Sequence, residues 1–258
     1  MMDMISPGMY IFVIFIAGIA GFIDAVAGGG GVITMPAYMF AGIPPHNAYA
    51  INKLAAVTGS VTAAVKYIRG GAVDIKVSVI AAAGSAVGGL ISAGIVMLLS
   101  DKVLEILVFI AIPLVAVAMI FHKNNPDGEH ALRKLTSGKV MMASGIGLAI
   151  GAYDGLIGSG VGTFAIIAFA SLMHYDYITA GGNSKVINVA SNAAALATFI
   201  LNGLMIFSIA VPCAIAALCG SWIGSKMALK NGAKIIRPMM FAVVAMMMIK
   251  MIYDMIAG

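Results

Sequence analysis

Four consecutive glycines, Gly28 to Gly31, follow directly on an apolar run and constrain the fold of this chain more than any other feature. Only a short apolar segment, Val32 to Ile43, comes after them before the Pro44–Pro45 break. A helix rises ~1.5 Å per residue and needs roughly twenty residues to cross the core of a bilayer, so this segment is too short to span alone. Interrupted backbone at membrane depth is stable only where protein or a water-filled cavity satisfies its polar groups. We therefore predict a short helix, broken at the glycines, inside a larger membrane bundle.

The composition supports a membrane location. Hydrophobic residues make up 62% of the 258 residues and charged residues 10%, and the mean hydropathy is +1.06. Soluble domains are about a quarter charged. The apolar runs are continuous rather than alternating with a period of two, which disfavours a transmembrane β-barrel. We predict an all-α polytopic protein that crosses the cell membrane several times, with the lipid bilayer around it.

The net charge of +5 does not indicate a nucleic-acid partner, because the basic residues lie in short segments between apolar runs, as in cytoplasmic loops. The most polar stretch is the expected cytoplasmic linker, residues 123–139, between an N-terminal repeat (1–122) and a C-terminal repeat (140–258) of one membrane unit. In the first repeat we expect long helices at Met9–Ala27 (entered through Ser6-Pro7), His46–Ile68, Ile75–Leu99 and Val103–Phe121.

The second half repeats the landmarks of the first in the same order. Asp24 matches Asp154 at an offset of 130 residues. Three further pairs match at an offset of 132: Lys53 with Lys185, Gly71 with Gly203, and Lys102 with Lys234. The run Gly84–Gly88 meets Gly220–Gly224 at an offset of 136. This regularity indicates an internal duplication, with four long helices and one short broken helix in each half.

The charges of equivalent loops indicate that the two halves are inverted. Basic residues flank the Gly70–Gly71 turn, whereas the matching turn around Gly203 carries no charge. Conversely, the segment at Ser100 is nearly neutral, and its counterpart is basic (Lys226, Lys230, Lys234 and Arg237). The positive-inside rule then places equivalent loops on opposite sides of the membrane. Inverted repeats are the plan of many secondary transporters.

The two glycine clusters are candidate binding elements. Gly28 to Gly31 and the run Gly158 to Gly162, which includes Ser159 and Gly160, each precede a short apolar helix. A helix N-terminus offers unpaired N–H groups and a positive dipole end, and glycine allows an oxyanion to approach the backbone. Two such ends facing each other would form an anion site in the middle of the membrane. The alternative is that these glycines only allow close helix crossings, which is the role we expect for Gly84–Gly88 and Gly220–Gly224.

Two lysines lie deep inside apolar helices, which is costly for a charged side chain. Lys53 follows Asn52, and Lys185 follows Asn183 and a serine. Lysines in equivalent positions of both halves are candidate counter-charges for an anion, together with the adjacent amides. The polar residues Asn188, Asn192 and Ser60 either line the pathway or bridge helices.

Asp24 and Asp154 each precede a glycine cluster by four residues. Intramembrane carboxylates commonly relay protons, so both are candidates for proton coupling. They could equally form internal ion pairs with Lys53 and Lys185, or hold the broken backbone by accepting N–H bonds.

Other chemistries find little support in the sequence. The glycine run lacks the Gly-Lys-Ser/Thr ending of a phosphate-binding loop, and the four histidines are scattered rather than spaced as metal ligands. We expect no metal, no cofactor and no catalytic residues. A transporter working by alternating access is the favoured function, ahead of a passive anion channel and an intramembrane enzyme.

Several blocks of the chain resemble the sulfite exporter TauE/SafE family of membrane permeases. They are GFIDAVAGGGGVITMPA, AGIPPHNAYAINKLAA, GAYDGLIGSGVGTF, GGNSKVINVASNAAAL and GAKIIRP, in the family's order. The resemblance implies a permease of small sulfur-containing anions such as sulfite or organosulfonates, with the glycine-rich and Asn-Lys blocks as its site. Ile51 replaces a common threonine of the family and Ser159 a common proline, so the substrate could differ from sulfite. Small-residue helix faces could also support a homodimer, although packing within one protomer uses the same surfaces.

Overall fold

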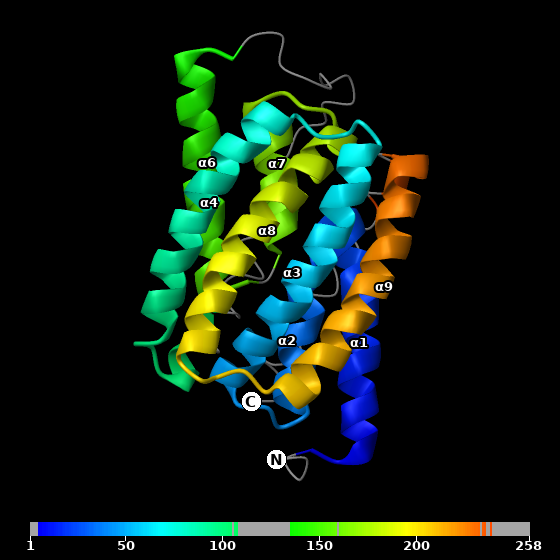
Figure 1. Cartoon of the computed structure of the whole chain (residues 1–258), viewed down its shortest axis with the longest axis vertical. Coiled ribbons are helices and arrows are strands. Elements are labelled where there is room, and N and C mark those ends of the chain that lie inside the picture. Colours follow the sequence, from blue (N-terminus) through cyan, green and yellow to red (C-terminus); the bar gives the residue numbers. More distant parts are fainter. Residues whose placement is uncertain are drawn as a thin grey trace.

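The computed structural model describes residues 5–104, 106–107, 135–158, 160–232, 234–235 and 238. Over these residues its elements are helices: α1 (Pro7–Ala27), α2 (Gly31–Phe40), α3 (Pro45–Arg69), α4 (Ile75–Val96), α6 (Ser137–Leu156), α7 (Val161–Leu172), α8 (Tyr177–Leu201) and α9 (Phe207–Asn231). The long helices run side by side along the longest axis of the molecule (Figure 1). The predicted all-α class is confirmed, and the predicted span Val103–Phe121 lies mostly outside the described residues, as does most of the predicted linker.

Four of these helices, α1, α4, α8 and α9, are both long enough and apolar enough to cross a membrane. Large apolar side chains are exposed on their outer faces, among them Ile11, Phe15, Leu90 and Trp222. In water such a surface would be unstable, whereas lipid tails would cover it. The helices α3 and α6 contain 25 and 20 residues, so they are also long enough to span.

Helix α1 begins and ends at the predicted signals. Ser6 is its N-cap and its hydroxyl accepts a hydrogen bond from the Met9 N–H at 3.3 Å, with Pro7 in the first turn. The helix ends at Gly28, whose φ of 79° is in the left-handed region that favours glycine. The first glycine of the cluster therefore terminates the helix.

The two short helices are also where the sequence predicted them. Helix α2 has 10 residues and α7 has 12, and both follow a glycine cluster. The prediction extended α2 to Ile43, but the helix ends at Phe40 because Gly42 adopts a φ of 84° and the Ile43 N–H turns back to the Tyr38 carbonyl at 3.0 Å. Neither helix is long enough to cross a bilayer alone.

Glycines bring the long helices into close contact in two similar pairs. On α4 and α6, a Cβ on Gly88 or Gly147 would overlap the backbone of the other helix. On α9 and α1, the same holds for Gly220 and Gly21. The packing role predicted for Gly84–Gly88 and Gly220–Gly224 is confirmed. In addition α4 packs along α8, and α9 along α3.

Candidate functional site

The two glycine clusters contact each other where α1 ends and α7 begins. The Thr163 N–H donates to the Gly28 carbonyl at 3.3 Å, and the Thr163 hydroxyl donates to the Ala27 carbonyl at 2.8 Å. A Cβ on Gly28 or Gly162 would overlap the backbone of the other segment. For these two glycines, the close-crossing interpretation therefore holds.

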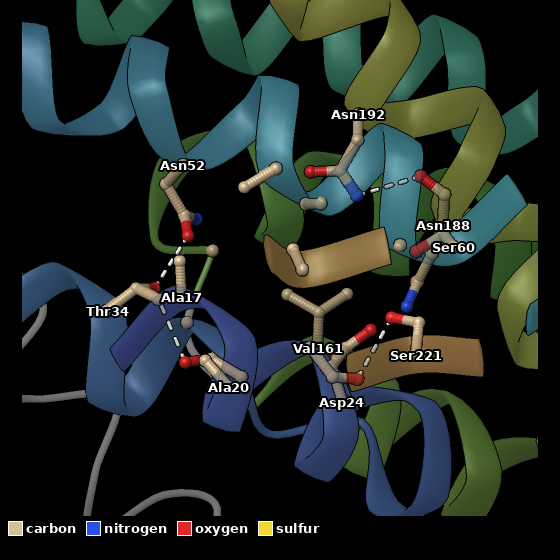
Figure 2. Close-up of a pocket in the computed structure, with 18 of the residues that line it drawn as sticks. Ala17, Ala20, Asp24, Thr34, Asn52, Ser60, Val161, Asn188, Asn192 and Ser221 are labelled. Atoms are coloured by element: carbon tan, nitrogen blue, oxygen red, sulfur yellow. Dashed lines mark hydrogen bonds between the residues drawn. The ribbon is translucent and has the colours of Figure 1, made fainter. Parts of the chain in front are cut away.

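A buried pocket lies beside this crossing, and the start of both short helices reaches it (Figure 2). Gly30 and Gly31 bring the N-terminus of α2 to the pocket, and Gly158 and Val161 bring that of α7. The first N–H groups of a helix have no intrahelical acceptor, and they carry the positive end of the helix dipole. Two positive helix ends thus border one small volume, together with the last turns of α1 and α6, which hold Asp24 and Asp154 and carry the negative ends of those helices.

The cavity is small and suits a compact ligand. Its volume is about 40 Å³, which is room for roughly three waters or one small ion. The rest of its lining comes from α1, α3, α6, α8 and α9, so the pocket lies at the centre of the bundle.

Polar side chains gather at the two ends of this pocket (Figure 2). At one end, the Thr34 hydroxyl donates to Asn52 Oδ1 at 2.6 Å, which leaves the amide nitrogen of Asn52 without a recorded partner among the described residues. At the other end lie Asn188, Ser60 and Ser221. Asn52 and Asn188, predicted as site residues, both line the pocket, as does Asn192.

Two of these polar groups are buried without a hydrogen-bond partner in the described part of the chain. They are the Ser60 hydroxyl and the Asn188 carbonyl oxygen, in side chains that are almost fully buried. Leaving a buried polar atom unsatisfied costs about 1–3 kcal/mol, so a water or a ligand in the pocket would stabilise this arrangement.

The two intramembrane lysines form ion pairs with the aspartates, and each pair joins the first half of the chain to the second. Lys53 Nζ lies 2.7 Å from Asp154 Oδ1 and also donates to the Asp154 carbonyl at 2.7 Å. Lys185 Nζ lies 2.9 Å from Asp24 Oδ2 and also donates to the Asp24 carbonyl. Both carboxylates line the pocket, whereas the lysines lie behind them. In this structure the ion-pair alternative considered above therefore holds.

Some predicted site residues lie elsewhere. Asn183 is fully buried, and its Oδ1 accepts from the Asp74 N–H at 2.9 Å and the Ser78 hydroxyl at 2.8 Å, so it ties α8 to the start of α4. Gly28, Gly29 and Gly160 adjoin the pocket but do not contribute to its lining, and Ser159 is outside the described residues. The described residues contain no group of three or more His, Cys, Asp or Glu that could hold a metal ion.

Sequence reasoning missed two polar residues of the pocket, Thr34 and Ser221, along with the small apolar residues of its wall. Thr34 is one turn after Gly30 on the short helix, a spacing that could have indicated it. Ser221 lies in the run Gly220–Gly224, which we interpreted as packing alone. Its hydroxyl donates to the Gly21 carbonyl at 3.0 Å, so it serves both packing and the pocket.

A helical bundle with several apolar spans, in which two short helices point their N-termini at a buried polar pocket, has the architecture of a multi-pass membrane transporter. The family model described as "Sulfite exporter TauE/SafE" matches residues 13–251. The chain belongs to this family.

Curated relatives cover almost the whole chain and carry transporter names. A probable membrane transporter protein YfcA from Escherichia coli (strain K12) is 33% identical over 97% of this chain and 92% of its own length. The probable membrane transporter protein ORF9 from a Sinorhizobium species is 34% identical over 94% of this chain and 92% of its own. A probable membrane transporter protein from Haemophilus influenzae is 32% identical over 94% of each chain. No solved structure gives a significant match.

Proposed function

We propose that this protein is a secondary transporter that moves small sulfur-containing anions, such as sulfite or organosulfonates, across the cell membrane by alternating access. The observation that carries the proposal is the convergence of the α2 and α7 N-termini on one buried pocket. The family description supplies the substrate class.

The charges around the pocket are balanced, so the available hydrogen-bond donors decide which ligand it favours. Two carboxylates line it and two lysines pair with them, so the ionised side chains sum to zero. The N-termini of α2 and α7 each add the equivalent of roughly half a positive charge, and the C-termini of α1 and α6 add the opposite. Lys53 and Lys185 already donate to carbonyls in the last turns of α6 and α1, whereas the Gly31 and Val161 N–H groups have no acceptor among the described residues. The helix ends therefore offer a ligand hydrogen-bond donors, which suits an anion.

Hydrogen-bond donors are available to such a ligand. The amide nitrogens of Asn52 and Asn188 and the hydroxyl of Ser60 can donate and have no partner among the described residues. Donors from the two helix ends and from these side chains would surround the oxygens of a small oxyanion, as charge-assisted hydrogen bonds require. We include Lys53 and Lys185 in the site although they do not line the pocket. They act on the ligand by holding the two carboxylates in place and by neutralising their negative charge.

The proposal includes an inverted repeat, because two inverted halves can expose a central site to each side of the membrane in turn. In support, the contacts between the two halves come in equivalent pairs: α1 packs on α9 as α6 packs on α4, and α3 packs on α9 as α8 packs on α4. The two ion pairs follow the same relationship: Lys53 of the first half pairs with Asp154 of the second, and the equivalent Lys185 pairs with Asp24. Rocking of the halves about the pocket would expose it to each side in turn.

Thermal stabilisation of the purified protein by a panel of anions tests the proposal. The panel contains sulfite, sulfate, thiosulfate, methanesulfonate, phosphate and chloride. A ligand at 100 times its Kd adds about 2.7 kcal/mol of stability, which is readily measured. We expect a selective rise in Tm with one sulfur oxyanion, reduced severalfold in affinity by Lys53→Met or Lys185→Met. A panel without any shift, or unchanged affinity in both lysine variants, would contradict it.

A further inference from the structure

The two lysine–aspartate pairs occupy equivalent positions but have different surroundings. Asp154 accepts from Lys53 and also from the Ser191 hydroxyl at 2.5 Å, and its side chain is only 3% exposed. The recorded partner of the Asp24 carboxylate within the described residues is Lys185, and the Asp24 side chain is 22% exposed, into the pocket. Asp154 therefore has both carboxylate oxygens hydrogen-bonded and is almost fully buried, whereas the Asp24 carboxylate is partly exposed to the pocket.

The sequence explains this asymmetry. Lys53 and Lys185 are 132 residues apart, and the same offset places Gly59 opposite Ser191. Gly59 has no hydroxyl to donate, and the space that a side chain there would occupy is taken by Ser221 of α9, whose Oγ lies 2.7 Å from the Cβ position. The Ser221 hydroxyl donates to the Gly21 carbonyl instead of to a carboxylate.

We propose that Asp24, and not Asp154, is the carboxylate that takes up a proton when an anion binds in the pocket. This inference rests on the anion transport proposed above. Both oxygens of the Asp154 carboxylate accept a hydrogen bond, one from Lys53 and one from the Ser191 hydroxyl, and only 3% of the side chain is exposed. Asp24 has one donor fewer and lies at the pocket surface, where water can deliver a proton.

Protonation of Asp24 links the proton to the anion. It leaves the Lys185 ammonium, whose side chain is 1% exposed, without its counter-charge, and a buried unpaired charge is unfavourable. An anion in the adjacent pocket supplies the missing negative charge. Proton and anion therefore strengthen each other's binding by the same factor.

Few other titratable groups face Asp24. Lys185 approaches from α8, Tyr67 of α3 donates its hydroxyl to the neighbouring Ala25 carbonyl at 3.2 Å, and the Lys53–Asp154 pair borders the same pocket. From α2, α7 and α9, the described lining residues are uncharged.

Calorimetric titration with methanesulfonate tests the proposal, because this anion stays ionised from about pH 5 to pH 8 and does not itself titrate. Repeating each titration in buffers of different ionisation enthalpy counts the protons taken up. For the wild-type protein we expect affinity to rise as the pH falls, by up to about tenfold per pH unit, with uptake of about one proton per anion. Asp24→Asn, which imitates the protonated side chain, should bind the anion with no pH dependence and no proton uptake.

Asp154→Asn is the matched control and should keep both the pH dependence and the proton uptake. The double variant Lys53→Met/Asp154→Asn, which removes the buried pair together and leaves no unpaired charge, serves the same purpose if the single variant Asp154→Asn does not fold. Loss of the pH dependence in Asp154→Asn together with its retention in Asp24→Asn would overturn the assignment. Anion binding by the wild-type protein without any pH dependence would overturn the proton proposal alone, whereas no binding at any pH would overturn the transport proposal as well.

Discussion

Lys53 on α3 contacts Asp154, at the end of α6, through two oxygens: its Nζ lies 2.7 Å from the carboxylate and 2.7 Å from the main-chain carbonyl. The ammonium thus binds both a charge and the last turn of a helix, where orphan carbonyls need a donor. Because the residues lie 101 positions apart in the sequence, the contact fixes the first half of the chain to the second.

Replacing Lys53 should destabilise the protein strongly. Lys53→Met leaves Asp154 almost completely buried without a counter-charge, which costs about 3–5 kcal/mol. We expect Lys185→Met to cost less, because Asp24 is open to the pocket and can be hydrated. Thermal unfolding of both variants in the same detergent measures the difference, and the double variant Lys53→Met/Asp154→Asn should recover part of the loss. Equal stability of Lys53→Met and the wild type would contradict the buried pair.

Two glycines of α6 provide a matched test of the packing. Gly147 faces Ala81 of α4 so closely that a Cβ would overlap its backbone, whereas Gly145 has no atom within 4 Å of its Cβ position. Gly147→Ala should therefore destabilise the bundle by about 1–3 kcal/mol, as overpacking does. Gly145→Ala should be neutral, or more stable by up to ~1 kcal/mol, since alanine is the better helix former. Similar Tm values for the two variants would contradict the contact between α4 and α6.

Substitutions of two asparagines of α8 should distinguish an effect on anion affinity from an effect on stability. Asn188 lines the pocket, and its amide nitrogen, a donor, has no partner in the described chain, so Asn188→Ala should weaken anion binding severalfold with little change in Tm. Asn183 accepts two hydrogen bonds from the start of α4, so Asn183→Ala should lower the Tm and leave the Kd nearly unchanged. Titration calorimetry and thermal unfolding of both proteins test this. The reverse pattern would show that the binding site lies elsewhere.

Much of the helical framework could be predicted from local signals. The cap at Ser6, the glycines that end α1 and the short apolar segment of α2 act through nearby backbone, so sequence patterns report them. The end of α2 was predicted three residues too late, because Gly42 and Ile43 form a turn whose hydrogen bonds the apolar pattern does not reveal.

The site was predicted less completely, because it depends on how distant helices are arranged. Nine of the residues named as candidates line the pocket: Asp24, Gly30, Gly31, Asn52, Ser60, Asp154, Gly158, Asn188 and Asn192. A linear pattern cannot show that Lys53 pairs with Asp154, since this choice requires α3 to meet α6. Nor can it show that Asn183 points to α4 while Asn188, on the same helix, points to the pocket.

Counterflow in proteoliposomes tests the central claim most directly. Vesicles containing the purified protein are loaded with unlabelled methanesulfonate or sulfite, and uptake of the labelled anion from a dilute outside solution is followed. A transporter working by alternating access should give transient uptake above equilibrium that saturates with substrate and is absent with chloride as the internal anion. Uptake that rises linearly with concentration and is unaffected by internal substrate would indicate a channel and contradict the account.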